Sequence, residues 1–195
     1  VYKRQNIYRS VGRLDEAITL YENLLPNHIR VLGADHPDTL TFRHNLAGAY
    51  VHASRFDEAI TLYEQVLPDR TRILGEDHPD TLSSRNSLAY AYHSAGRLTE
   101  AITLYEQLLP DRTRILGDNH PNTLSSRNNL AGAYESAGRL TEAITLYEQV
   151  TKDCARILGE DHPLTKTVRD NLEAARRELA QQKGESSTEE SAAQD

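Results

Sequence analysis

The sequence contains no methionine, no tryptophan and a single cysteine among its 195 residues. Because a translated chain starts with methionine, this absence indicates a fragment or a processed piece. One cysteine cannot form a disulfide within the chain, which favours a reducing, cytoplasmic compartment. No apolar run approaches the length of a membrane-spanning helix, and no signal-peptide pattern opens the chain, so we expect no membrane partner.

Basic residues are also scarce relative to acidic ones. The chain has 22 Lys and Arg against 29 Asp and Glu, a formal net charge of −7 and a pI near 5.6. Nucleic acids bind surfaces with an excess of positive charge, so nucleic acid is not expected as a partner. Hydrophobic residues make up 38% of the chain, which suits a thin, layered core better than a single thick one.

What the sequence does contain is an internal repeat of 42 residues. Residues 55–96 and 97–138 are nearly identical, and further copies begin at Arg13 and Arg139. An alanine and a tyrosine keep the same register in every copy: Ala17, Ala59, Ala101 and Ala143, with Tyr21, Tyr63, Tyr105 and Tyr147. A fixed period of this length predicts repeated structural units that stack and share a core.

Each period holds two helical patterns. Pro79 opens one of them, with Asp77 or His78 as its N-cap, and Gly96 ends it. Apolar residues recur every three or four positions in both patterns, and no strand pattern is present. First helices are therefore predicted over about 37–53, 79–95 and 121–137, and second helices over about 14–32, 56–74, 98–116 and 140–158. Alternating helices without strands predict an all-α fold, an α-solenoid of antiparallel helix pairs.

The residues within the period resemble those of the tetratricopeptide repeat (TPR) family. Leu88, Ala89 and Tyr92, followed by Ala101 and Tyr105, match its L-G-x-x-Y…A-x-x-x-F pattern. The long second helix and the L-G-x-D/N-H-P link resemble the 42-residue variant found in kinesin light chains and in bacterial signalling proteins. The resemblance spans about residues 7–180 and implies a right-handed superhelix with a concave, partner-binding face.

The two ends depart from the pattern. Residues 1–5 fall outside the register and are interpreted as a divergent or non-native leader, with the repeats covering 6–163. Glu173 and Arg176 occupy positions that are apolar in other copies, so residues 164–180 are predicted to form a solvent-facing capping helix. The polar, acidic residues 181–195 are predicted to be disordered.

Prolines recur inside the second helices at Pro26, Pro68 and Pro110. An interior proline costs about 3 kcal/mol and usually bends a helix, so we expect the bend to shape the repeat array.

Histidines also recur, one in each link, at His36, His78, His120 and His162. Equivalent residues of neighbouring units lie too far apart to share one ion, so helix capping explains them better than metal binding. No nucleophile–base pair or phosphate-binding loop is present in the sequence, and we expect neither enzymatic activity nor a cofactor.

An arginine ladder, Arg43, Arg85, Arg127 and Arg169, lies close to the apolar stripe of the first helices. A charge in that position needs a partner, and its alkyl stem can cover apolar surface. Asp69, Asp111 and Asp153 recur at the facing end of the second helices. The arginines are therefore predicted to form structural ion pairs, with an acid-binding ladder that faces a ligand as the alternative.

The family resemblance also implies which residues line the concave groove. They are Thr41, His44, Gly48 and Val51 in one unit, Ser83, Asn86, Tyr90 and His93 in the next, and Ser125, Asn128, Gly132 and Glu135 in the third. In this family an asparagine at the site of Asn86 and Asn128 often bonds the main chain of an extended peptide, because an amide both donates and accepts.

Gly48 and Gly132 flank Tyr90 at equivalent positions in the middle of their helices. Glycine there costs about 1 kcal/mol relative to alanine, so its presence needs a reason. Two explanations stay open at this point: the glycines make room for a partner's side chain beside Tyr90, or they let adjacent first helices pack closely.

Three functions are compatible with the sequence. The leading one is a non-enzymatic scaffold that binds a peptide or protein partner in its concave groove. The second is a sensor or autoinhibitory arm of a larger signalling NTPase. The third is a structural array that associates with itself through its N-terminal repeat edge.

Overall fold

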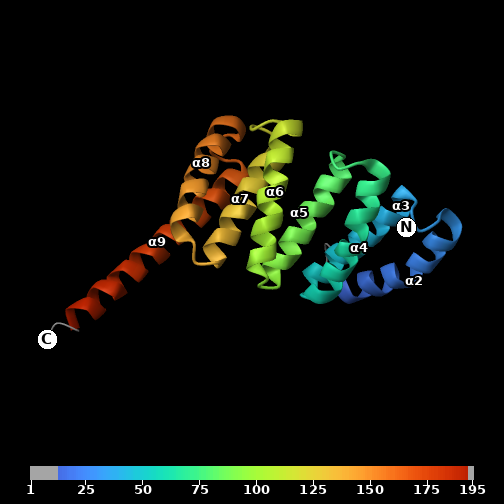
Figure 1. The fold of residues 1–195 in the computed structure, drawn as a ribbon, viewed down its shortest axis with the longest axis horizontal. Helices are drawn as coiled ribbons and strands as arrows, with labels where there is room; N and C mark the ends of the chain where they lie inside the picture. The colour runs from blue at the N-terminus through green and yellow to red at the C-terminus, as the bar shows by residue number, and fades with distance from the viewer. Residues whose placement is uncertain (1–12, 193–195) are drawn as a thin grey trace. The chain divides into compact units, whose positions relative to one another are not determined.

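The structure is a computed structural model that describes the backbone of residues 13–192 and the side chains of residues 13–184. Across that range the chain forms eight helices and no strand (Figure 1). The helices are α2 (Leu14–Leu32), α3 (Pro37–His52), α4 (Phe56–Leu74), α5 (Pro79–Ser94), α6 (Leu98–Leu116), α7 (Pro121–Ser136), α8 (Leu140–Leu158) and α9 (Pro163–Ala192). The predicted all-α solenoid of helix pairs is confirmed. Residues 1–5, the predicted leader, lie outside the described range.

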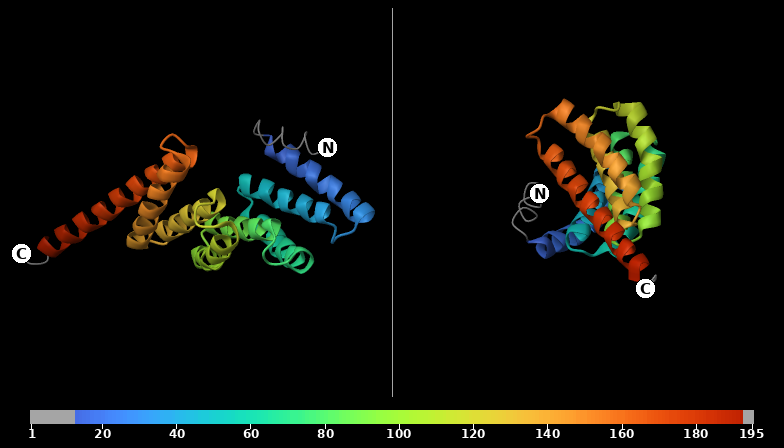
Figure 2. Two further views of the ribbon diagram at one scale, coloured as in Figure 1. Left: turned by 90° about the horizontal axis from the view of Figure 1, so that it is seen from above. Right: turned by 90° about the vertical axis from the view of Figure 1, so that its left-hand side faces the viewer.

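The chain divides into two compact units, 1–104 and 105–195, with the boundary inside α6. In the first unit α3 packs against both α2 and α4, and α5 packs against α4 (Figure 2). In the second unit α8 packs against both α7 and α9. The most extensive packing within each unit therefore joins a first helix to a second helix next to it in sequence.

A histidine caps the N-terminus of each first helix. The Nδ1 atom of His78 accepts a hydrogen bond from the Asp80 amide at 3.1 Å, and His36, His120 and His162 make the equivalent bond at 3.1–3.2 Å. Such a bond satisfies one of the amides that a helix start leaves unpaired. The capping role expected for these histidines is confirmed, and His78 rather than Asp77 is the N-cap of α5.

The second helices run without interruption through their prolines. Pro26, Pro68 and Pro110 lie within α2, α4 and α6 and are exposed to solvent. The bend expected at these positions stays a prediction.

The core is a thin layer between neighbouring helices. Ala17, Ala59, Ala101 and Ala143 are completely buried, and the tyrosines four residues later are at most 3% exposed. Alanine allows two helix backbones to approach closely, while the following tyrosine fills the wider space beside it. Apolar clusters around Phe42 in the first unit and Val150 in the second continue this layer.

A tyrosine near the end of each first helix joins three consecutive helices. The hydroxyl of Tyr92 donates to Glu64 of α4 at 2.6 Å, and the guanidinium of Arg97, at the start of α6, lies 4.5 Å from the centre of its ring. The same arrangement is built on Tyr50 and on Tyr134. In the last copy Arg176 replaces the tyrosine and pairs with Glu148 at 2.6 Å, so the link between helices persists in another chemical form.

The last helix differs from the prediction. It was expected to end near residue 180 and to be followed by a disordered tail, but α9 continues to Ala192 and extends past the end of α8 (Figure 1). The structure thus describes helical backbone for residues 181–192, where disorder was predicted. A helix that is already nucleated adds one hydrogen bond with each further residue, and this stretch contains no proline to stop it.

The backbone of Ser54 is strained, whereas the glycines at the equivalent positions of later copies are not. It has a φ of 59°, while Gly96 and Gly138 occupy the same place in later copies with φ of 75° and 73°. Serine in this left-handed region costs about 1 kcal/mol more than glycine. We expect Ser54→Gly to raise the free energy of unfolding by about that amount, as measured by urea denaturation. Gly96→Ser is the matched control and should lower it; a Ser54→Gly variant no more stable than the parent would contradict the assignment of strain.

The hydrogen-bonded tyrosines make stability depend on pH in the alkaline range. Burial and the bond to glutamate raise the pKa of Tyr50, Tyr92 and Tyr134 to about 12, against about 10 in an unfolded chain. A tyrosine of this kind stabilises the fold while protonated, so its contribution is complete below about pH 10 and is lost between about pH 10 and 12. Urea unfolding at a series of pH values should show this decline. A variant with all three tyrosines changed to phenylalanine should show a shallower one; an equal slope would exclude them as the cause.

Candidate functional site

A cavity of about 220 Å³ opens between the two first helices of the first unit, α3 and α5. Most of its lining comes from one face of each helix, and Tyr63 of α4 contributes from the layer beneath. The lining residues are His44, Asn45, Gly48, Val51, His52, Tyr63, Asn86, Ser87 and Tyr90.

The helical period explains why these residues meet. His44, Gly48 and Val51 are separated by four and three positions, so they share one face of α3, and Asn86 and Tyr90 share one face of α5. All five were predicted from the sequence to line the groove. Thr41, Ser83 and His93, predicted with them, lie on the same two helices outside the cavity lining.

Tyr90 is the prominent aromatic group of this site, because 48% of its surface is exposed. An exposed aromatic ring offers a large apolar contact area at little cost in side-chain entropy. Tyr63, by contrast, is 3% exposed and stacks edge-on against His44, with ring centres 5.1 Å apart. The cavity thus combines a fixed aromatic wall with an accessible one.

Gly48 leaves open space rather than permitting close helix packing. Among the described residues of neighbouring helices, the Tyr63 hydroxyl is the atom that a Cβ placed on Gly48 would meet within 4 Å, at a distance of 3.4 Å. Because no backbone of those helices lies within that range, close packing does not explain this glycine. For Gly48 the geometry therefore favours the first explanation, room beside Tyr90. Gly132 is half-buried in α7, and its two explanations stay open.

A buried arginine positions His44 through the hydroxyl of Ser84. Arg70 of α4 is 3% exposed and donates to the Ser84 hydroxyl at 2.8 Å, and that hydroxyl lies 3.3 Å from Nδ1 of His44. Arg70 also donates to the Thr41 hydroxyl at 3.1 Å and to the Asp80 carbonyl at 3.0 Å. Burial lowers its pKa, and its two Nη atoms donate to these three neutral oxygens, while its buried Nε has no hydrogen-bond partner among the described residues. This network links the three helices beneath the cavity.

In the second unit the predicted groove residues make bonds within the chain. The side chain of Asn128 accepts a hydrogen bond from Asn171 of α9 at 3.2 Å. Glu135 accepts one from the Tyr147 hydroxyl at 2.8 Å, and burial together with this bond raises the pKa of that tyrosine. Ser125 and Gly132 are half-buried on the same helix. A peptide that used Asn128 would have to share it with Asn171.

Members of the arginine ladder contact carboxylates. Arg43 lies 3.7 Å from Asp69, and Arg127 lies 3.2 Å from Asp153 while also pairing with Asp118. Arg169 pairs with Glu160, a residue of the link before α9. These contacts support the ion-pair interpretation of the ladder. The pairing of Arg85 with Asp111, and the contribution of the ladder to stability, stay predictions.

Sequence reasoning missed four residues of the cavity: Tyr63, Asn45, His52 and Ser87. Tyr63 belongs to the buried tyrosine series, and a periodic core residue gives no signal that its hydroxyl reaches a cavity. It also missed the buried arginines Arg70 and Arg112, which replace His28 and Cys154 of other copies. Their position on the buried stripe of the second helices was the available signal.

Among the residues with described side chains, no cluster of three or more histidine, cysteine or acidic groups could hold a metal ion. No helix in the described part of the chain is long and apolar enough to cross a membrane.

A family model described as tetratricopeptide repeat matches residues 6–71, 43–112, 86–154 and 128–185. No curated protein was found to match. Two crystal structures contain nearly identical TPR-like repeats that are described as those of a kinesin light chain from Podosopora anserina. The sequence of each is 32% identical to this chain. One match covers 93% of this chain and 86% of that one with a TM-score of 0.80, and the match to a substituted form of the same repeats covers 97% and 89% with a TM-score of 0.81.

A more distant similarity is to BtubC (BKLC) from P. vanneervenii. The identity is 22%, the match covers 90% of this chain and 70% of that one, and the TM-score is 0.76. At this identity the likeness concerns the fold.

The space beside Gly48 leads to a stability prediction. Alanine is a better helix former than glycine, and its methyl group would make ordinary contact with the Tyr63 hydroxyl. We expect Gly48→Ala to raise the free energy of unfolding by about 0.5–1 kcal/mol, as measured in urea. A decrease would mean that a Cβ atom does not fit, and that the glycine is required by packing after all.

Proposed function

Because the chain belongs to the tetratricopeptide repeat family, with repeats of the kinesin-light-chain-like type, we propose that it is a non-enzymatic module that binds a peptide segment of a protein partner. Repeats of this family generally mediate protein–protein interaction. The binding surface we propose is the face formed by the first helices. The observation that carries the proposal is the cavity between α3 and α5, with exposed Tyr90 at its rim.

The cavity suits one side chain of an extended peptide. Val51 and the exposed ring of Tyr90 offer apolar contact, while His44, Asn86 and Ser87 offer polar groups. A side chain with an apolar body and a polar tip matches that combination. Asn86 can donate to and accept from the peptide main chain at the same time, which fixes the direction of the peptide.

The rigidity of the cavity supports affinity. His44 is held by its stacking on Tyr63 and by the Ser84 hydroxyl, which Arg70 holds in turn. A site that is already ordered loses little conformational entropy on binding. In the second unit Ser125, Asn128, Gly132 and Glu135 lie on α7, and we propose them as the groove residues of that unit. Cys154, a buried free thiol, is compatible with work in a reducing cytoplasm.

The test is to select peptides from a random library on the parent chain and to measure their dissociation constants on variants. Gly48→Leu fills the cavity with a good helix former, and Tyr90→Ala removes the exposed ring. We expect each to weaken the selected peptides at least about tenfold, while Gln107→Ala, an exposed change on α6, leaves binding unchanged. Urea unfolding confirms that each variant is folded. Peptides that bind the parent, Gly48→Leu and Tyr90→Ala equally would refute the proposed site.

A further inference from the structure

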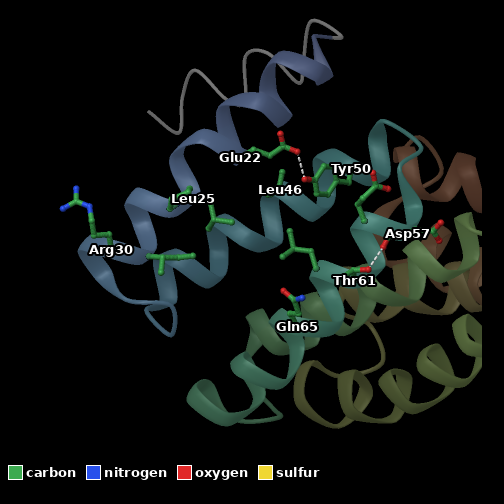
Figure 3. Close-up of a pocket in the computed structure, with 12 residues that line it drawn as sticks. Glu22, Leu25, Arg30, Leu46, Tyr50, Asp57, Thr61 and Gln65 are labelled. Atoms are coloured by element: carbon green, nitrogen blue, oxygen red, sulfur yellow. Dashed lines mark hydrogen bonds between the residues drawn. The ribbon is translucent and has the colours of Figure 1, made fainter.

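The face formed by the second helices carries a larger and more apolar cavity than the one beside Tyr90. It has a volume of about 760 Å³ and lies between α2 and α4, with α3 as its floor (Figure 3). Leu46 and Tyr50 of α3 form that floor, and Leu25, Ile29 and Leu62 form its walls. We call it the second-helix groove.

The internal repeat supplies a comparison for each residue of this groove. Most lining positions carry the same residue in the next two copies, as Leu62 does with Leu104 and Leu146. Two positions differ. Ile29 stands where the later copies have Thr71, Thr113 and Ala155, and Asp57 stands where Thr99 and Thr141 follow. Both residues line this one groove. Ile29 makes its lining more apolar, and Asp57 makes it more acidic, than the equivalent residues of the later copies would.

Charge is distributed unevenly along the groove. At one end lie Glu22, Asp57 and Glu58, with Arg55 beside them as a compensating cation. Arg30 lies at the other end, far from Asp57 (Figure 3). Glu22 is fixed by the Tyr50 hydroxyl at 2.7 Å, so its carboxylate stays at the rim. The excess of negative charge at this end favours a cation in the occupant and disfavours phosphate groups of lipids or nucleic acids.

We propose that the second-helix groove binds an amphipathic helix of a protein partner, with a lysine or arginine directed toward Glu22, Asp57 and Glu58. The wall of α2 runs from Glu22 to Arg30, which at about 1.5 Å per residue is about 12 Å, or two helical turns. A partner helix of two turns can place apolar side chains, spaced three and four residues apart, against Leu25, Ile29 and Leu62. The proposal concerns a different face from the peptide site beside Tyr90 and does not depend on it.

The probe for this surface is a synthetic, alanine-rich helical peptide of about four turns. It carries leucines three and four residues apart on one face, a glutamate near its N-terminus and two lysines near its C-terminus. A second peptide has both lysines replaced by glutamine. Binding is measured by fluorescence anisotropy of the labelled peptide at low and at physiological salt.

The repeat itself provides the variants, because each substitution introduces a residue that other copies already accommodate. Ile29→Thr should weaken the lysine peptide about tenfold, since an apolar contact is replaced by a hydroxyl. Asp57→Thr should weaken it about threefold at low salt and leave the glutamine peptide unaffected. Tyr90→Ala should leave binding of both peptides unchanged.

Several results would overturn the proposal. They are the absence of binding to the parent chain at millimolar peptide, equal affinity for the parent and Ile29→Thr, and a loss on Tyr90→Ala as large as on Ile29→Thr. The last outcome would place the peptide on the first-helix face instead. Binding of the peptides selected from the random library is expected to depend on Tyr90, whereas binding of this helical probe is not. Failure of one proposal can therefore be told apart from failure of the other.

Discussion

The structure depends on one constraint: a helix pair of this sequence cannot bury its apolar faces by itself. In the first unit α3 packs against a second helix on either side, α2 and α4. The fully buried alanines let neighbouring backbones approach, and the tyrosines that follow fill the space beside them. The hydrogen bond from Tyr92 to Glu64 and the contact of Arg97 with the Tyr92 ring then join α4, α5 and the start of α6. Stability is therefore shared among neighbours rather than held in one core.

Because the copies are nearly identical, their differences separate architecture from candidate function. Residues that every copy keeps, such as the capping histidines, serve the fold. Among the residues that differ between copies, His44 and Tyr90 lie at the cavity on the first-helix face, and Ile29 and Asp57 lie at the groove on the second-helix face. The same scaffold thus offers two surfaces of different chemistry, one with imidazole and amide groups and one apolar with an acidic rim.

The 42-residue period was enough to place the helices and the lining face of α3 and α5, because helical periodicity decides which side chains share a face. It could not show that Asn128 bonds Asn171 or that Glu135 bonds Tyr147, since those contacts depend on the relative rotation of packed helices. It also did not predict helical backbone for residues 181–192, because composition reports the lack of an apolar face but not the continuation of a helix already formed.

The sequence by itself determined the repeat, the helix pairs and the family, all of which follow from short-range patterns and their recurrence. It left both Asp77 and His78 open as the N-cap of α5, and the structure shows that His78 is the cap. Only the tertiary structure decided which positions enclose empty space. The cavity beside Gly48 exists because the described backbone of the neighbouring helices stays away from that glycine, and the second-helix groove exists because α2 and α4 stand apart above Leu46. Both are consequences of distances between helices, and such distances are set by the whole packed layer rather than by any single segment.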